Sequence, residues 1–170
     1  MSQRGPGRAT LFEPVTASPT GAAAAFYVAA LASYDDVKAM LARYDRTSIG
    51  GAMLSATLWQ CEGDVVRAES ALRRAAETVS EAERPYVVDL LAPLLVSRGL
   101  YTRAAGLLGT APVPPAFEAG RLALRSVIDA AGGNVALSDE RAGAARDALV
   151  RLDDEVFHLR VHQRLAMAAA

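Results

Sequence analysis

The chain has 170 residues, enough for a single domain that buries roughly 70% of its unfolded surface. Hydrophobic residues make up 52% and charged residues 22%, which indicates a globular protein, and 18 basic against 19 acidic residues give a net charge of −1. This balance argues against a dedicated nucleic-acid-binding protein, because such proteins draw much of their affinity from a basic excess that neutralises phosphates.

The first 19 residues differ in composition from the rest of the chain. They contain Pro6, Pro14 and Pro19, with two glycines, and show no hydrophobic periodicity. This composition predicts a disordered N-terminal arm over residues 1–19, followed by one helical domain over residues 20–170.

The longest apolar run covers residues 22–32 and is too short to cross a bilayer. Glu13 separates this run from Arg4 and Arg8, so the start of the chain does not match a secretory signal peptide. Cys61 is the only cysteine, which rules out an internal disulfide and fits a reducing compartment. We therefore expect a cytoplasmic protein that does not bind a membrane.

From Thr20 onward, apolar residues recur at spacings of three and four between glycines, prolines and aspartates. This pattern is typical of short amphipathic helices, and no stretch alternates as a strand does. Gly132 and Gly133 predict a helix stop, and Ser138 is the expected N-cap of the next helix. The sequence predicts helices over residues 21–31, 34–44, 48–60, 65–79, 85–98, 101–108 and 115–131, an eighth from Ser138 to about residue 152, and a ninth from Asp154.

The helix over residues 65–79 has the clearest pattern, and its apolar residues are expected to face the core together with Leu72. Its polar residues are expected to point away from the core; these are Arg67, Glu69, Arg73, Arg74 and Glu77. The helix over residues 85–98 is apolar on nearly all sides, which predicts a buried helix with Leu94 in the core. In the helix over residues 101–108, Tyr101, Ala104, Ala105 and Leu108 are expected to share one face.

Two segments repeat the same order of features. Gly63-Asp64-Val65 and Gly99-Leu100-Tyr101 each follow an apolar helix, and Ala68 and Ala104 each stand five residues after the glycine. This resembles the tetratricopeptide repeat, in which a Gly-x-Tyr turn joins helix A to helix B and a small residue in helix B allows close packing. The resemblance covers about residues 34–131. The repeat length is irregular and the last pair lacks the Gly-x-Tyr sequence, so an irregular helical bundle stays open as the alternative.

The resemblance implies an all-α fold of antiparallel helix pairs stacked as a short solenoid, whose inner face holds a peptide or another protein. It further implies a non-enzymatic interaction module, such as the scaffolding or sensory part of a bacterial regulatory assembly, without a cofactor. Two other functions stay open. One is a small-molecule-sensing domain of a transcriptional regulator, with a cavity between the third, fifth and seventh predicted helices. The other is a homo-oligomerisation unit that uses the first and ninth helices.

Arg67, Arg73 and Arg74 form the only local basic cluster of the chain and are the candidate partner-binding residues. They lie on one helix and are interleaved with Glu69 and Glu77, a pattern typical of a solvated face. An acidic peptide is the partner chemistry that such a cluster favours.

The sequence predicts no catalytic or metal site. Glu155, His158 and His162 lie near one side of the last helix, but they are too few for the usual zinc or di-iron ligand sets. Asp153 and Asp154 stand at the start of that helix, where acidic side chains complement the helix dipole. Cys61 has no histidine near it in sequence and is expected to be a buried thiol beside Trp59, and no glycine-rich loop has phosphate-binding spacing.

Overall fold

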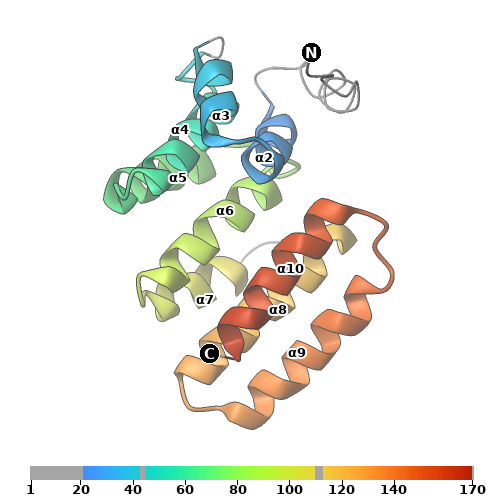
Figure 1. Cartoon of the computed structure of the whole chain (residues 1–170). Coiled ribbons are helices and arrows are strands. Elements are labelled where there is room, and N and C mark those ends of the chain that lie inside the picture. Colours follow the sequence, from blue (N-terminus) through green and yellow to red (C-terminus); the bar gives the residue numbers. More distant parts are fainter. Residues whose placement is uncertain (1–20, 43–44, 110–112, 170) are drawn as a thin grey trace, which may run out of the picture. The chain divides into compact units, whose positions relative to one another are not determined.

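The computed structural model describes residues 21–42, 45–109 and 113–169. Within these ranges the regular elements are nine α-helices, with no strand, so the predicted all-α fold is confirmed (Figure 1). The predicted arm over residues 1–19 lies outside the described residues. The helices are α2 (Ala22–Leu31), α3 (Tyr34–Leu41), α4 (Ile49–Cys61), α5 (Val65–Thr78), α6 (Arg84–Ser97), α7 (Tyr101–Gly109), α8 (Pro115–Ala131), α9 (Val135–Leu149) and α10 (Glu155–Ala168).

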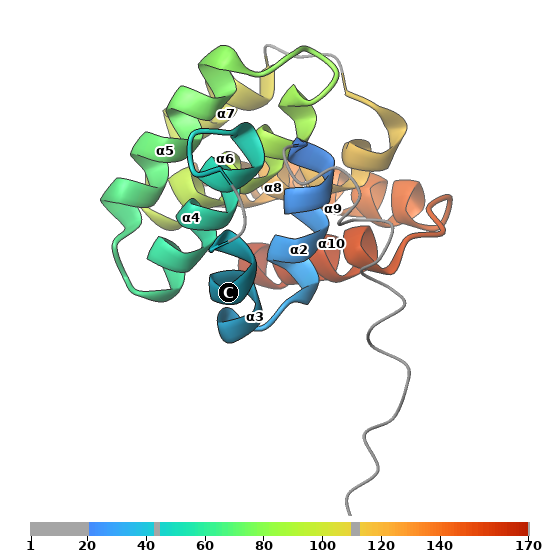
Figure 2. The same cartoon turned by 90° about the horizontal axis from the view of Figure 1, so that it is seen from above.

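The chain divides into two compact units, unit 1 over Met1–Ala75 and unit 2 over Ala76–Ala170. Unit 1 contains α2, α3, α4 and most of α5, and unit 2 contains α6 to α10 (Figures 1 and 2). The prediction of one domain over residues 20–170 stays a prediction. No helix in the described ranges is long and apolar enough to span a membrane.

Three helices end in the same glycine turn. Gly63, Gly99 and Gly133 have positive φ angles of 83°, 71° and 79°, a conformation that glycine adopts without steric cost. In each turn the glycine N–H donates to the carbonyl three residues earlier, and the next N–H donates to the carbonyl five residues before it. These two bonds satisfy carbonyls that the helix end leaves without partners. The turns at Gly63 and Gly133 have the same geometry as the turn at Gly99, although only the Gly99 turn carries the tyrosine.

A small buried residue follows each glycine turn. Ala68, Ala104 and Ser138 each stand five residues after the glycine, and all three are buried. The prediction that Ser138 caps its helix is wrong, because α9 begins at Val135 and has Asn134 as its N-cap residue. Ser138 instead lies inside the first part of α9, where its Oγ shares a buried hydrogen bond of 3.1 Å with Ser126 Oγ on α8.

In unit 1, α4 contacts both α2 and α3. Ser48 caps α4 by accepting a hydrogen bond from the Gly51 N–H at 3.0 Å. Gly51 permits the preceding loop to approach, because a Cβ there would lie 2.2 Å from the Asp45 carbonyl oxygen. The hydroxyl of Tyr34 on α3 donates to Glu62 Oε1 at the end of α4, at 2.7 Å. The hydrogen bond between Tyr34 and Glu62 thus links α3 to α4.

The buried side of α5 follows the predicted stripe, with one exception. Leu72 is fully buried, which confirms its prediction, and Leu94 on α6 is buried as well. Asp64 caps α5 by accepting from the Arg67 N–H at 3.1 Å. The prediction that Glu69 points away from the core is wrong, since Glu69 is buried beside the apolar stripe.

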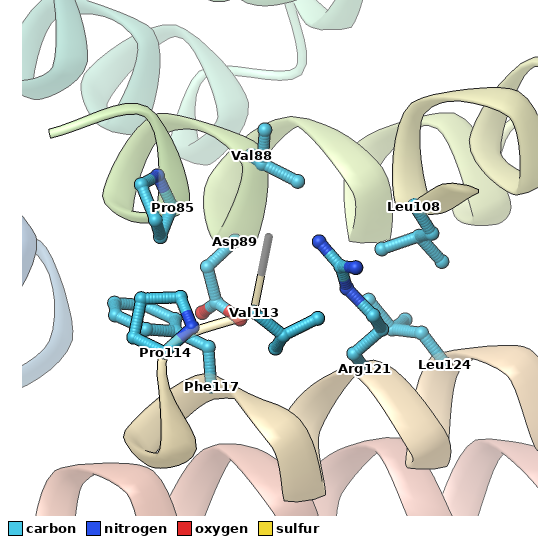
Figure 3. A pocket seen from close by; sticks show the side chains of 9 residues that line it. All are labelled: Pro85, Val88, Asp89, Leu108, Val113, Pro114, Phe117, Arg121 and Leu124. Carbon is cyan, nitrogen blue, oxygen red and sulfur yellow. The ribbon is translucent and has the colours of Figure 1, made fainter. Parts of the chain in front are cut away.

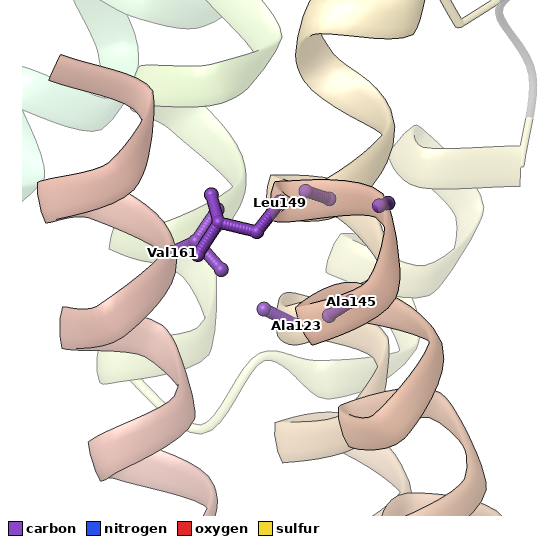
Figure 4. Close-up of a cluster of buried hydrophobic side chains, with 6 residues drawn as sticks. Ala123, Ala145, Leu149 and Val161 are labelled. Carbon is purple, nitrogen blue, oxygen red and sulfur yellow. The ribbon is translucent and has the colours of Figure 1, made fainter. Parts of the chain in front are cut away.

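In unit 2, α8 contacts both α6 and α7, and α9 and α10 pack against it in turn. Small residues dominate where α8, α9 and α10 meet, so their backbones approach closely (Figure 4). The cluster consists of Ala119, Ala123, Ala145, Ala148, Leu149 and Val161. On α7, Ala104 and Leu108 are buried as predicted, whereas Tyr101 and Ala105 are exposed and do not share that face.

Candidate binding site

Unit 2 contains a half-open hollow between α6, α7 and α8 (Figure 3). Most of its walls are aliphatic, aromatic or proline side chains, and Asp89 and Arg121 are the two charged residues among them. The space in it that water-sized groups can occupy is about 20 Å³, and one water molecule needs about 10–15 Å³ by this measure. The hollow therefore has room for about one water molecule and not for a metabolite. Its lining residues are Pro85, Val88, Asp89, Leu108, Val113, Pro114, Phe117, Arg121 and Leu124.

Asp89 is a buried carboxylate whose two oxygens both accept hydrogen bonds from α10. Arg164 Nη1 donates to Oδ1 at 2.7 Å, and Arg160 Nη1 donates to Oδ2 at 3.2 Å. Arg164 Nη2 also donates to the Asp89 backbone carbonyl at 3.0 Å. Asp89 and Arg164 are 7% and 4% exposed, so this is a desolvated ion pair in which hydrogen bonds offset part of the burial cost.

Gly120 on α8 makes room for Arg164. A Cβ at this position would lie 2.3 Å from Arg164 Nη1 and 3.5 Å from Asp89 Oδ1. Any larger residue at position 120 would therefore push the guanidinium away from its carboxylate. Asp89 lies on α6, Gly120 on α8, and Arg160 and Arg164 on α10. We call Asp89, Arg160 and Arg164 the Asp89 cluster. It depends on all three helices, because Gly120 of α8 leaves the space that Arg164 occupies.

Two arginines at or near the hollow have lowered pKa values. Burial lowers the pKa of Arg121, and the nearby charge of Arg125 lowers it further. Arg125 Nη2 donates to the carbonyl of Leu108, a lining residue, at 3.3 Å. Burial also lowers the pKa of Arg160, an effect that the Asp89 carboxylate opposes. Both shifts show that cationic groups lie here in a poorly solvated environment.

Phe117 joins the wall of the hollow to the core of unit 2. Its ring makes edge-to-face contacts with Tyr86 on α6 and Phe157 on α10, each with centroids 5.0 Å apart. Such pairs stabilise a fold beyond the area that they bury. The wall of the hollow is therefore held in place by side chains from two other helices.

The predicted basic cluster lies elsewhere, on the exposed side of α5 in unit 1. The guanidinium of Arg67 lies over the Trp59 ring, 4.6 Å from its centroid. Arg73 Nη1 lies 3.5 Å from Glu69 Oε1. Arg74 is exposed on the same helix. The helix thus presents all three arginines to solvent.

The two histidines of α10 and Asp154 make contacts within the protein. His158 Nε2 lies 2.8 Å from the Leu152 carbonyl oxygen, and its ring centroid is 6.4 Å from that of His162. Asp154 caps α10 by accepting from the Val156 N–H at 2.9 Å. Among the residues that the structure describes, no group of three or more His, Cys, Asp or Glu side chains could hold a metal ion.

The prediction that Cys61 is a buried thiol is wrong, because the cysteine is exposed. Cys61 is the last residue of α4 and lies directly before the turn at Gly63. Trp59, two residues earlier, is half-buried and supports the Arg67 guanidinium.

No family model matches the chain, and comparisons with curated proteins and with solved structures give no significant match. The assignment of a site therefore depends on the geometry described above.

Sequence reasoning missed the hollow and the Asp89 cluster, although one feature pointed to them. Asp89 is the one charged residue between Arg84 and Arg98, in a segment otherwise rich in valine and leucine. A carboxylate in a buried helix needs a cationic partner. Its partners stand 71 and 75 residues later in the chain, beyond the reach of any local pattern.

Proposed function

We propose that this chain is a non-enzymatic protein-interaction module built from stacked helix hairpins, similar in plan to a tetratricopeptide-repeat domain. The observation that carries the proposal is the order of contacts within each unit. In unit 1, α4 contacts both α2 and α3, and in unit 2, α8 contacts both α6 and α7, which also contact each other. Stacked helical repeats pack each repeat on its neighbour in this way and use the resulting surface to bind other proteins.

The glycine turns support the same plan. Gly63, Gly99 and Gly133 are separated by 36 and 34 residues, close to the period of about 34 residues in tetratricopeptide repeats. Each turn is followed by a small buried residue that permits close approach of two helices. On this basis we further propose a role as a scaffolding or sensory part of a cytoplasmic regulatory assembly.

The hollow of unit 2 does not favour the small-molecule-sensing alternative. Such a domain needs an enclosed apolar cavity, whereas this hollow is half-open and has room for about one water molecule.

Affinity capture from the native host, followed by quantitative mass spectrometry, tests the proposed function. We expect the wild-type chain to enrich one or a few proteins over an unrelated helical protein of similar charge. A parallel capture with Arg67→Glu, Arg73→Glu and Arg74→Glu combined tests the basic cluster on α5, since all three residues are exposed. A chain that enriches no protein over the control, at low and at physiological salt, would contradict the proposal.

A further inference from the structure

We propose that one exposed face of α10 is a docking surface for an amphipathic helix of a partner protein. This face, which we call the α10 row, consists of Leu159, Gln163, Ala166 and Met167, spaced by four, three and one residues along one side of the helix. The inference rests on the proposed function and names the kind of element that the partner supplies. The observation that carries it is that the equivalent rows of α6 and α8 are buried.

The helices α6, α8 and α10 can be compared residue by residue, because an aromatic contact fixes their register. The rings of Tyr86, Phe117 and Phe157 stack edge to face, with centroids 5.0 Å apart at each of the two steps. Each ring belongs to the third residue of its helix. The aromatic contacts and the helix starts therefore give the same register.

In this register the fifth, ninth, twelfth and thirteenth residues of each helix form one row. On α6 and α8 every residue of the row is buried, with no more than 7% exposed, whereas on α10 all four are exposed, Leu159 by 47% and Met167 by 43%. The α10 row thus occupies positions that both earlier helices bury. The buried equivalents are Val88, Ala92, Leu95 and Val96 on α6 and Ala119, Ala123, Ser126 and Val127 on α8.

On α8 the row is covered by helices that follow it in the chain. Ala119 and Ala123 lie in the buried cluster that α8 forms with α9 and α10 (Figure 4), and Ser126 shares its hydrogen bond with Ser138 of α9. In the same unit, α7 and α8 both pack against α6. The interface is therefore one between helices each time, and in the part of the chain that the structure describes no helix follows α10.

The composition of the α10 row indicates the chemistry of the helix that covers it. The last helix of a stack normally presents a polar outer face, but Leu159, Ala166 and Met167 present apolar surface to solvent. Burial of this surface supplies affinity, and the amide of Gln163 needs a hydrogen-bond partner once it is buried. The partner helix should carry apolar residues at spacings of three and four and a polar side chain opposite Gln163, as Ser138 of α9 provides for α8.

A phage-displayed library built on the α9 sequence provides the probe, because α9 covers the equivalent row of α8. The buried positions of α9 are randomised, selection is run on the wild-type protein, and an enriched peptide is synthesised for binding measurements. We expect Ala166→Arg to weaken binding of this peptide by about tenfold or more, because a long side chain at a point of close approach holds two helices apart.

Two controls keep the test decisive. Ala144→Arg places the same side chain on the exposed surface of α9 and should bind the peptide as the wild type does. Both alanines are exposed, so both variants should melt close to the wild type, which separates lost binding from lost structure. Hydrogen exchange of the wild-type protein gives a readout without any substitution, because the bound peptide should slow exchange of the α10 amides.

Three outcomes would overturn the inference. One is a library that yields no binder, and another is a peptide that binds Ala166→Arg as tightly as the wild type. The third is dimerisation of the wild-type protein that Ala166→Arg abolishes, measured by sedimentation equilibrium, because it would assign the α10 row to a second copy of this chain. The proposed function is decided separately by affinity capture. Proteins enriched equally by the wild type and by Ala166→Arg would support the proposed function and count against the α10 row.

Discussion

Two groups of arginines illustrate how differently one residue type behaves in the two units. On α5 of unit 1, Arg67, Arg73 and Arg74 are exposed; Arg67 lies over the Trp59 ring of α4, and Arg73 lies near Glu69 of its own helix. In unit 2, Arg160 and Arg164 lie against the buried carboxylate of Asp89 on another helix. An ion pair with one exposed partner contributes little to stability because water competes for that charge, whereas breaking a pair in which both partners are buried leaves an uncompensated charge. The comparison predicts large effects in unit 2 and small ones on α5.

Asp89→Ala should have the largest effect. It leaves the guanidiniums of Arg160 and Arg164 without their carboxylate, and breaking a buried ion pair in this way costs about 3–5 kcal/mol. Chemical denaturation measures the change in the free energy of unfolding. A loss below about 1 kcal/mol, the range of exposed pairs, would show that the two groups of arginines do not differ as described.

Gly120→Ala tests the same cluster without removing a charge. The new methyl group would lie 2.3 Å from Arg164 Nη1, so the guanidinium must move, and overpacking of this kind costs about 1–3 kcal/mol. Gly143→Ala is the matched control, because a Cβ at this position on α9 meets nothing within 4 Å. We expect this control to be slightly stabilising, since alanine favours a helix over glycine. Equal melting temperatures for the two variants would contradict the assigned role of Gly120.

Ala104 and Ala105 are uncharged neighbours on α7, so substitutions at these two positions test the effect of burial without a change of charge. Ala104 is fully buried on α7 and Ala105 is exposed. Ala104→Leu should destabilise by about 1–3 kcal/mol because the side chain forces two helices apart. Ala105→Leu should change the unfolding free energy by no more than about 0.5 kcal/mol. Denaturant titrations of the two variants compare them directly, and equal losses would show that position 104 is not a site of close approach.

Arg73→Ala should have the smallest effect. The side chain of Arg73 is 54% exposed, and helix pairs at this spacing contribute about 0.3–0.5 kcal/mol before solvent screening reduces that value. Thermal melts at low and high salt should therefore place the variant close to the wild type, with any difference smaller at high salt. A destabilisation comparable to that of Asp89→Ala would show that the partly exposed pair with Glu69 behaves as a buried one.

The helices were largely predictable from the sequence because their boundaries depend on local features. Pro115 and Gly132 delimit α8 as predicted, since proline favours a first helical position and the glycine turn ends the helix. Local preference failed at Ser138, a residue type that favours N-caps, because the turn at Gly133 already begins α9 at Val135. The exposure of Cys61 was missed for a similar reason, since burial at a helix end depends on where the next helix packs.

The candidate site was not predictable in the same way. The three arginines on α5 were found because they are neighbours in sequence, and the structure places them on one exposed surface. The hollow requires α6, α7 and α8 to meet, and the Asp89 cluster requires α10 as well. Nothing in the spacing of residues encodes which helices meet. The lone Asp89 indicates that a partner exists but does not identify it.

The Asp89 cluster also orders events during synthesis of the chain. The glycine turns close over only a few residues, so hairpins such as α6 and α7 can form as soon as their own residues have left the ribosome. The bond from Arg164 to Asp89 spans 75 residues and must wait for nearly all of unit 2 to be translated. At translation rates of about 5–20 residues per second, Asp89 spends several seconds without its partners. Until α10 has been made, only water can solvate the Asp89 carboxylate, and the arrival of α10 completes the ion pair.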